Sequence, residues 1–314
     1  MKSGARVYVA GGDTLVGAAL LRGLRADGTV CLLNDTEDTG LVLASAASVD
    51  AFFARTRPEY VFLAAGESGG IHTNQAHPAR LMLDNLLSAC HVMDAAYRNG
   101  CRKLLYLGSA CCYPVHCAQP MHEAALLTGP PEPTNEHYAL AKLAGLKLCQ
   151  AYRKEFGADY ICGIPPNPFG IEDDFDPASS HVIPSLIDRM HRTTCENAAY
   201  CDVWGSGAAR REFLFADDLA DACRFVMDHY SDSAPINLGG GEAMSIAELA
   251  SAVRDVTGFR GEIRFNTSKP DGMPIKMLDS SKLRAMGWRP RTPFHEALRI
   301  TYQAYLRKEL EIRN

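Results

Sequence analysis

Apolar runs of strand length alternate with stretches of helical periodicity along the first half of the chain. The apolar runs predict buried strands at residues 6–10, 30–33, 60–65, 103–108 and 160–164. Helical periodicity follows the first run as far as Leu24 and recurs over 81–99, where Gly100 is a suitable stop. Repeated strand–helix units of this kind predict a parallel, doubly wound sheet with ligands at the carboxyl ends of its strands.

The order of elements becomes mixed in the second half of the chain. A long loop over 165–181, rich in Pro and Asp, separates the two halves, and we expect it to be functional. Beyond it the pattern predicts a helix around 183–193, a strand near Val203, a helix from Asp217, a strand at 236–238 and a helix from Ser245. No internal repeat or flexible linker separates these elements.

We therefore expect an α/β protein with a Rossmann-like, doubly wound parallel sheet and a smaller mixed α/β lobe that is woven into it. The dinucleotide-binding domain is predicted at residues 1–170 plus about 213–240. The substrate-binding lobe is predicted at about 171–212 plus 241–314.

Composition limits the classes of partner. The chain has 314 residues, a net charge of −5 and 47% hydrophobic residues, without a basic patch for nucleic acid or a membrane surface. No apolar run approaches the ~18 residues of a membrane span, and no signal peptide precedes the first strand. Eleven irregularly spaced Cys residues indicate reduced thiols, so we expect a cytoplasmic protein with neither nucleic-acid nor membrane partners.

A Gly-rich turn connects the first strand to the first helix. Its backbone N–H groups and the helix N-terminus predict a cradle for a pyrophosphate. The spacing is the GxxxxxG frame of short-chain dehydrogenases, with Thr14 where a middle Gly is usual. The residues predicted to bind the cofactor are Gly11, Asp13, Thr14, Leu15, Val16 and Gly17, together with Ala64 and Ala65 at the end of the third strand.

Tyr138 and Lys142 form the most informative pair in the chain. Residues four apart share one face of a helix, and Asn135 or Thr134 can cap that helix. A nearby ammonium favours phenolate and lowers a Tyr pKa, which suits proton exchange with a ketone or alcohol oxygen. Ser109 ends a predicted strand about thirty residues upstream and can donate a second hydrogen bond to that oxygen. The set predicts carbonyl or alcohol redox chemistry beside a hydride-carrying cofactor.

Over nearly its full length the chain resembles the GDP-L-fucose synthases, the 3,5-epimerase/4-reductases of GDP-4-keto-6-deoxymannose among the extended short-chain dehydrogenases. The segments that carry the resemblance are GGI at 69–71, LGSACCYP at 107–114, EPTNEHY at 132–138, SHVIP at 180–184, VWGSG at 203–207, REF at 211–213 and KPDG at 269–272.

The resemblance implies a role for each matching residue. Cys111 and His181 correspond to the pair that inverts C3 and C5 of the keto sugar. Tyr138 would protonate the oxygen at C4, Lys142 would anchor the nicotinamide ribose and Ser109 would orient the ketone. The nucleotide sugar would contact Asn167, Arg189, Trp204, Arg211 and Lys276. A homodimer packed through helices at 81–99 and 138–153 is implied as well.

Two departures from the family pattern affect specificity. NADP(H) is the family's usual cofactor, but Asp13, Asp35 and Glu37 place acids where the 2′-phosphate would lie, so we expect NAD(H) to be favoured. Extra Pro residues over 165–170 stiffen a loop that faces the substrate and leave the choice of sugar open.

Other readings remain open at this level. The enzyme could act on another GDP-sugar or other nucleotide-activated sugar, as a reductase alone or an epimerase alone. A noncatalytic dinucleotide sensor is the alternative from another class, although a sensor has no need of a proton donor. Cys111, Cys112, His116 and Cys117 fit no common zinc spacing, so no metal is expected.

Overall fold

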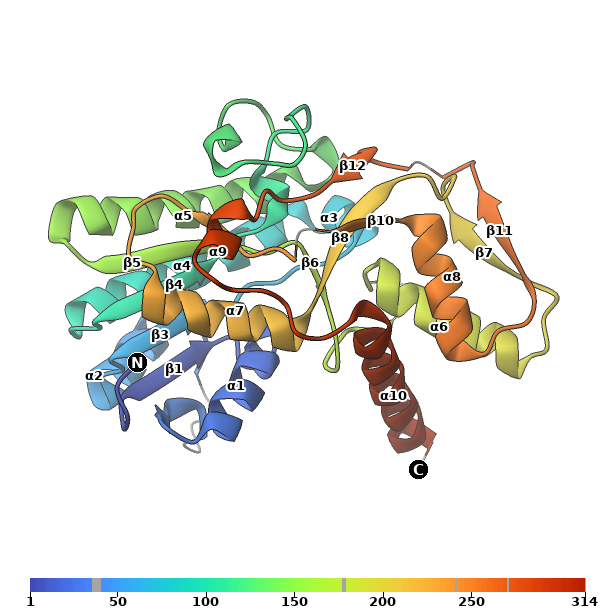
Figure 1. The fold of residues 1–314 in the computed structure, drawn as a ribbon. Helices are drawn as coiled ribbons and strands as arrows, with labels where there is room; N and C mark the ends of the chain where they lie inside the picture. The colour runs from blue at the N-terminus through green and yellow to red at the C-terminus, as the bar shows by residue number, and fades with distance from the viewer. Residues whose placement is uncertain (36–40, 177–178, 241, 270, 314) are drawn as a thin grey trace.

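The computed structural model describes residues 1–35, 41–176, 179–240, 242–269 and 271–313. Among these, parallel strands form a six-stranded sheet in the order β2-β1-β3-β4-β5-β9, which confirms the predicted Rossmann-like fold (Figure 1). The strands are β1 (Arg6–Ala10), β2 (Cys31–Leu32), β3 (Tyr60–Leu63), β4 (Lys103–Leu107), β5 (Asp159–Ile164) and β9 (Ile236–Asn237). The sheet lies in the left half of Figure 1, and the second lobe lies to the right.

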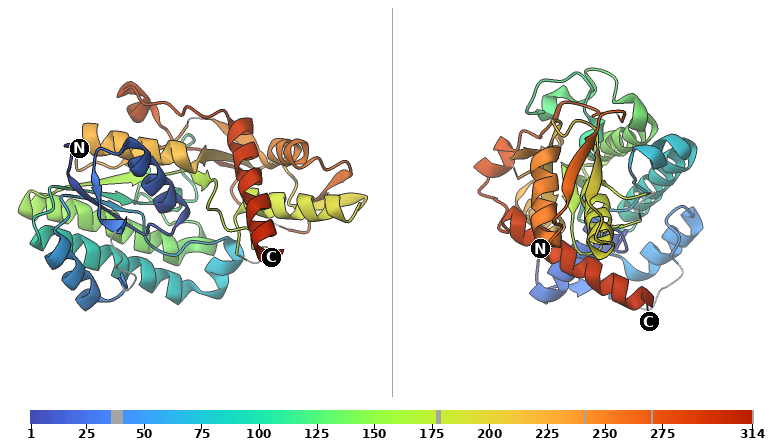
Figure 2. Two further views of the ribbon diagram at one scale, coloured as in Figure 1. Left: turned by 90° about the horizontal axis from the view of Figure 1, so that it is seen from below. Right: turned by 90° about the vertical axis from the view of Figure 1, so that its right-hand side faces the viewer.

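Helices cover both faces of this sheet, as the views in Figure 2 show. One face packs against α1 (Leu15–Asp27), α7 (Ala216–His229) and α9 (Ser281–Ala285), and the other packs against α2 (Ala46–Thr56), α4 (Pro78–Arg98) and α5 (Glu136–Phe156). Because successive strand residues face opposite sides, Leu104 and Tyr106 enter one core whereas Leu105 and Leu107 enter the other. Both faces are therefore buried, as expected for a parallel sheet.

The second lobe has its own hydrophobic core, formed by α6 (Val182–Cys195), α8 (Ile246–Thr257), α10 (Phe294–Arg313) and β7 (Tyr200–Trp204). Strand β11 (Glu262–Asn266) pairs in parallel with β7. Strand β8 (Arg210–Phe215) pairs with β6 (Asn167–Phe169), β10 (Ala243–Ser245) and β12 (Ile275–Lys276). We propose the predicted two-domain division for this molecule, with the separate cores as its support. Residues 278–288, including α9, differ from that division, because Leu278, Leu283 and Trp288 pack in the cores of the main sheet.

Short elements connect these units. They are α3 (Ile71–Ala76) and 3₁₀ helices at Leu33–Asp35, Ala110–Cys112, Glu123–Ala125 and Pro133–Asn135. The second predicted strand is shorter than expected, because the chain turns into a 3₁₀ helix at Leu33. Asn34 ties that turn to β1, since its side chain accepts from Val9 N at 2.9 Å and donates to Val9 O at 2.8 Å.

Several elements escape the sequence pattern. Helices α2 and α10 were not predicted, although Ser45 caps α2 by accepting a hydrogen bond from Ser48 N. Strands β6, β8, β10 and β12 were not predicted either, since they are short or only partly buried. The predicted side-chain cap of α5 is wrong, because Asn135 holds the N-cap position but its side chain makes no capping bond.

Candidate active site

One cavity of about 960 Å³ lies at the carboxyl ends of β1, β3 and β4. Its lining contains all the residues predicted to be catalytic, namely Ser109, Cys111, Tyr138, Lys142 and His181. It also contains Gly11, Asp13, Thr14, Leu15, Val16, Ala64 and Ala65 from the predicted cofactor set, and Asn167 from the predicted substrate set. The structure thus brings two groups of residues, far apart in the sequence, to one hollow at the predicted edge of the sheet.

The Gly-rich turn leaves no room for additional side-chain atoms. Gly11 has a φ of +81°, and a Cβ there would lie 2.6 Å from the Cα of Ala65. A Cβ on Gly17 would lie 1.8 Å from the backbone oxygen of Gly11, so α1 starts directly against the turn. Gly17 therefore supports the turn by packing against Gly11, and it is not part of the cavity lining among the described residues.

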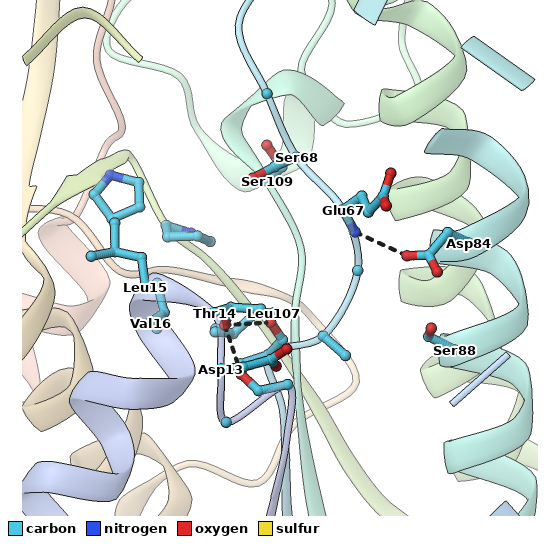
Figure 3. A pocket seen from close by; sticks show the side chains of 18 of the residues that line it. Asp13, Thr14, Leu15, Val16, Glu67, Ser68, Asp84, Ser88, Leu107 and Ser109 are labelled. Carbon is cyan, nitrogen blue, oxygen red and sulfur yellow. Dashed lines mark hydrogen bonds between the residues drawn. The ribbon is translucent and has the colours of Figure 1, made fainter. Parts of the chain in front are cut away.

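Thr14 replaces the usual middle Gly without obstructing the turn. It is the N-cap of α1, and its hydroxyl accepts from Gly17 N at 3.1 Å and lies 2.8 Å from Gly11 O and 3.2 Å from Ala64 O. Figure 3 shows Thr14 at the turn, with Leu15 and Val16 beginning the helix beside it. The first N–H groups of a helix have no partner inside it, so the N–H groups of Leu15 and Val16 are free to bind an anion.

Carboxylates outnumber cations around the cavity. Lys142 is the only Lys or Arg among its described lining residues, whereas the lining acids are Asp13, Glu67, Asp84, Glu172, Asp173 and Asp174. Some of these acids have partners: Asp84 accepts from Glu67 N at 3.0 Å, as drawn in Figure 3. Asp13 is exposed at the turn. The side chain of Asp35 and all of Glu37, on which the cofactor prediction also rests, lie outside the described residues.

These features fit a dinucleotide. Its pyrophosphate would lie at the turn and the start of α1, where the chain packs so closely that a Cβ on Gly11 or Gly17 would meet backbone atoms. The adenine would meet an apolar wall that includes Leu33, Val42 and Phe52. Lys142 would hold the nicotinamide ribose near Tyr138 and Ser109.

A 3₁₀ helix at Ala110–Cys112, shortly after β4, positions Ser109 and Cys111. Ser109 is the N-cap of this helix, and its Oγ accepts a hydrogen bond from Cys111 N at 3.2 Å. Cys111 faces the cavity, whereas Cys112 turns inward and its Sγ lies 3.8 Å from the backbone oxygen of Ala139. Burial raises the pKa of the Cys112 thiol to about 12, so this neighbour stays protonated at neutral pH.

The structure corrects the predicted effect of Lys142 on Tyr138. Burial raises the pKa of the Tyr138 phenol and the Cys111 thiol adds to this, while a hydrogen bond with Ser109 opposes it. The Lys142 ammonium lies 5.8 Å from the Tyr138 ring centroid and donates to the backbone oxygens of Ala65 and Leu107, both at 3.3 Å. Burial also lowers the pKa of Lys142 to about 8. The phenol is therefore held neutral, as a proton donor must be.

His181 approaches from the other side of the cavity as the N-cap residue of α6, without a side-chain capping bond. Solvent reaches the ring through the cavity, yet protein atoms surround it, and this desolvation lowers the pKa of the imidazole. Asp174 opposes the shift and Lys276 adds to it. The ring is therefore mainly neutral at pH 7 and can accept a proton.

Most residues predicted to bind the nucleotide sugar lie elsewhere. Arg189, Trp204, Arg211 and Lys276 are not in the described lining of the cavity. Trp204 is 60% exposed, with Arg189 5.7 Å and Lys269 5.1 Å from its ring centroid, so core packing does not explain this residue. Arg189, Lys269 and Trp204 together form a basic and aromatic surface on the second lobe, separate from the cavity lining.

Arg211 and Lys276 lie side by side, as partners in the register of β8 and β12. The Arg211 guanidinium donates to the backbone oxygens of Met273 at 2.6 Å and Asp271 at 3.2 Å, and burial lowers its pKa. The Lys276 ammonium donates to Cys111 Sγ at 3.3 Å. The sequence predicts Lys276 as a contact of the nucleotide sugar and gives no sign of its contact with Cys111, because 165 positions separate the two residues.

The described residues contain neither a metal-binding cluster nor a membrane-spanning helix. No group of three or more His, Cys, Asp or Glu side chains there is arranged to hold a metal ion. No helix within the described part of the chain is long and apolar enough to cross a membrane. All eleven cysteines are free thiols.

Comparison with known proteins agrees with this geometry. The model of the NAD dependent epimerase/dehydratase family matches residues 7–239. A relative named putative GDP-L-fucose synthase 2, from Arabidopsis thaliana, is 47% identical over 306 residues, which cover 98% of this chain and 93% of the relative.

Two solved structures share the fold. A GDP-L-fucose synthetase from Naegleria fowleri, bound to NADP, has a TM-score of 0.89 at 26% identity, covering 100% of this chain and 98% of the other. A GDP-6-OMe-4-keto-L-xylo-heptose reductase from C. jejuni has a TM-score of 0.88 at 29% identity, covering 98% and 99%. The chain is therefore an NAD(P)-dependent enzyme of the short-chain dehydrogenase type and belongs to the GDP-L-fucose synthase family.

Proposed function

We propose that the protein converts GDP-4-keto-6-deoxy-D-mannose into GDP-L-fucose by inverting C3 and C5 and then reducing C4. The observation that carries this proposal is the shared cavity, in which Cys111 and His181 meet Ser109, Tyr138 and Lys142. A reductase needs the second set alone, whereas inversion at carbon needs an additional acid and base. The name of the Arabidopsis relative supports the same substrate and product.

Epimerisation uses the acidity that the 4-keto group gives to the C–H bonds at C3 and C5. When a base removes one of these protons, the electron pair of the C–H bond delocalises onto the ketone oxygen. A proton returned to the opposite face of the same carbon inverts the centre. Thiols and imidazoles as classes titrate closer to neutrality than most side chains, and Cys111 and His181 serve as this pair.

Reduction of C4 follows while the sugar stays bound in the same place. The bound dihydronicotinamide supplies the hydride. Tyr138, whose phenol is kept neutral by burial, gives its proton to the oxygen at C4. Ser109 holds that oxygen, and Lys142 orients the ribose from its position below the Tyr138 ring.

A second candidate is a reductase or epimerase of the same fold that acts on another GDP-sugar. The C. jejuni structure is titled as such a reductase, with a heptose in place of the deoxyhexose. The loop over Pro165–Gly170 favours this alternative, because its Pro165, Pro166 and Pro168 line the cavity and restrict the shape of the sugar.

We propose NADH as the preferred cofactor, although NADP is bound in the Naegleria neighbour. The support is electrostatic. A 2′-phosphate brings ~1.5–2 negative charges by analogy with other phosphomonoesters, and Asp13 stands exposed at the turn it would approach. The described lining offers Lys142 as its sole Lys or Arg, at the opposite, nicotinamide end.

The deciding experiment incubates the purified protein with GDP-4-keto-6-deoxymannose and either NADH or NADPH, and identifies the product. GDP-L-fucose, with solvent deuterium at C3 and C5 when the reaction runs in D₂O, is the expected result. A reduced but unepimerised sugar, or no turnover with this substrate, would exclude the proposed activity. Comparing kcat/KM for the two cofactors at fixed ionic strength tests the NADH preference separately.

The protein is also proposed to be a homodimer through α4 and α5. These helices pack side by side, and Leu83, Tyr97, Leu140 and Phe156 are exposed on them. Sedimentation of the wild type against a Tyr97→Glu, Phe156→Glu variant tests this, since two charges in a shared apolar face should yield monomers. A wild type that sediments as a monomer at micromolar concentration would contradict the proposal.

A further inference from the structure

The Cys111 sulfur accepts hydrogen bonds from two donors that belong to different parts of the molecule. The Asn135 amide, at the start of α5, donates to it at 3.2 Å. The Lys276 ammonium, on β12, donates to it at 3.3 Å. Two donors aimed at one sulfur stabilise a thiolate, which is the reactive form of cysteine, over a thiol.

The segment that carries Lys276 is fixed on both sides of this residue. On the N-terminal side, Ile275 and Lys276 pair in register with Arg210 and Arg211 of β8. On the C-terminal side, Met277 N donates to the side chain of Gln119 at 3.0 Å, and Met277 O accepts from Met121 N at 2.7 Å. The ammonium therefore reaches Cys111 from a rigid support, which limits the entropy lost on making the contact.

A buried carboxylate adds a third attachment. Glu212 is 1% exposed and accepts from Leu278 N at 2.8 Å, two positions after Lys276. Glu212 and Arg211 are neighbours on β8, so the strand that carries Arg211, a predicted contact of the nucleotide sugar, also fixes Lys276. Lys276 is not part of the described cavity lining, and its contact with Cys111 gives it a route to act on the substrate through that sulfur.

We propose that Lys276 and Asn135 are positioning residues that hold Cys111 as a thiolate aimed at the sugar ring. The inference rests on the proposed epimerisation, in which Cys111 exchanges a proton with the sugar carbon. The thiolate takes the proton and becomes a thiol, while the C–H electron pair moves onto the 4-keto oxygen. Lys276 keeps the sulfur charged before this step, and the Asn135 amide fixes its direction.

Several other titratable groups surround this sulfur. Tyr138 and Cys112 interact electrostatically with Cys111, and both stay protonated at neutral pH because burial raises their pKa values. Lys142 is close enough to act on Cys112. Lys276 also acts on His181 and helps to lower the pKa of that imidazole. Lys276 is therefore the cation in direct contact with the sulfur.

The test measures alkylation of Cys111 by iodoacetamide, followed by peptide mass spectrometry. This reaction requires the thiolate but neither substrate nor cofactor. Lys276→Met should slow alkylation of Cys111 at pH 7 about tenfold or more, and the rate should recover at pH 9.5. Exposed Cys31 and Cys195 serve as internal controls, and their rates should not change.

Three further variants separate charge from fold. Lys276→Arg keeps a cation at this position and should restore most of the alkylation rate. Asn135→Ala should slow alkylation less than Lys276→Met, because it removes a neutral donor. Lys147→Met removes an exposed lysine from α5 and should leave every rate unchanged. Each variant is first compared with the wild type by thermal unfolding.

Deuterium exchange into the keto sugar connects the result to turnover. Lys276→Met should lower exchange at C3 and C5 to the same degree as alkylation, while hydride reduction of an already epimerised 4-keto sugar stays within about twofold. If Cys111 of Lys276→Met is alkylated at the wild-type rate at pH 7, the inference is wrong. If the wild type shows no exchange at all, the proposed epimerisation fails, whereas the alkylation result still decides the role of Lys276.

Discussion

The cofactor side and the proposed substrate side of the site are built from the sequence in different ways. On the cofactor side, Thr14 and Ser109 follow strands of the main sheet at the start of the next helix, and Lys142 lies in the second turn of α5. On the proposed substrate side, Arg189, Trp204 and Arg211 lie outside the described lining of the cavity and come from α6, β7 and β8, which belong to a lobe with short strands and its own core. The first arrangement is local in sequence, and the second exists only after the chain has folded.

This difference affects how rigidly each side is held before ligands bind. The cofactor side is fixed by backbone contacts, such as the approach of Gly17 to Gly11, and by the buried Lys142. Trp204 on the substrate side is exposed and meets cations instead of core residues. We therefore expect substitutions on the cofactor side to affect the chemical step, and substitutions on the substrate side to affect binding.

Tyr138→Phe should have the largest effect of the substitutions on the cofactor side, because it lowers the rate of C4 reduction. It keeps the ring and removes the proton that burial holds on the phenol. Loss of a general acid should lower the rate of C4 reduction ~10²–10⁴-fold, while cofactor affinity changes little. The consumption of dihydronicotinamide, followed by absorbance, measures this rate. Tyr97→Phe on the outer face of α4 is the control, and equal rates for both variants would remove Tyr138 from the mechanism.

Asp173→Asn probes the loop that joins the two sides. Asp173 is 4% exposed, and burial raises the pKa of its carboxyl to about 7. The folded state thus binds a proton that the unfolded state releases near pH 4, so stability is greatest at low pH and falls as pH rises toward 7. From pH 5 to pH 8 the loss should be roughly 2–3 kcal/mol, at about 1.4 kcal/mol per pKa unit.

The Asn side chain cannot ionise, so the variant should lack this part of the pH dependence. Chemical denaturation at pH 5 and pH 8 measures the difference for both proteins. Asp255→Asn, at an exposed position on α8, is the matched control and should behave as the wild type does. Parallel pH profiles for the wild type and Asp173→Asn would show that this carboxyl ionises normally.

The same difference explains what the sequence could and could not predict. The strands of the main sheet, the Gly-rich turn and the helix of Tyr138 and Lys142 follow from local patterns, because each of these elements forms from residues that are close together in the sequence. Strands β6, β10 and β12 contain two or three residues each, too few to give an apolar pattern. The sequence also gives no sign that Lys276 contacts Cys111, since only the pairing of β12 with β8 brings them together.

The prediction that Lys142 lowers the pKa of Tyr138 is wrong for a related reason. A spacing of four residues places Lys142 on the same helix face, but it says nothing about how deeply both groups are buried. In the structure Lys142 is 6% exposed, and its ammonium is engaged by two backbone oxygens. Desolvation then outweighs the attraction between the charges.

Arg211→Ala tests whether the proposed substrate side contributes to binding and not to the chemical step. We expect KM for the nucleotide sugar to rise about tenfold, which corresponds to ~1.4 kcal/mol, with kcat and NADH binding nearly unchanged. Because Arg211 also donates to the backbone oxygens of Asp271 and Met273, Arg211→Lys is included to retain the charge. Arg264→Ala, where the guanidinium stacks over Tyr200, is the control. A lowered kcat with unchanged KM would place Arg211 in the chemical step and contradict the division between the two sides.

The smallest expected effect lies at the outer end of the cofactor side, at Asp13. Its carboxylate is exposed and has solvent around it, so its repulsion of a 2′-phosphate is of the order of 1 kcal/mol at about 4 Å in water. Asp13→Ser should therefore move the ratio of kcat/KM for NADPH to that for NADH upward by about fivefold, with NADH turnover little changed. The ratio should shift less in 0.5 M salt than at low ionic strength, because salt screens exposed charges. Asp255→Asn again provides the control. A ratio that does not respond to Asp13→Ser would mean that the 2′ position lies away from this carboxylate, and the proposed NADH preference would then lose its main support among the described residues.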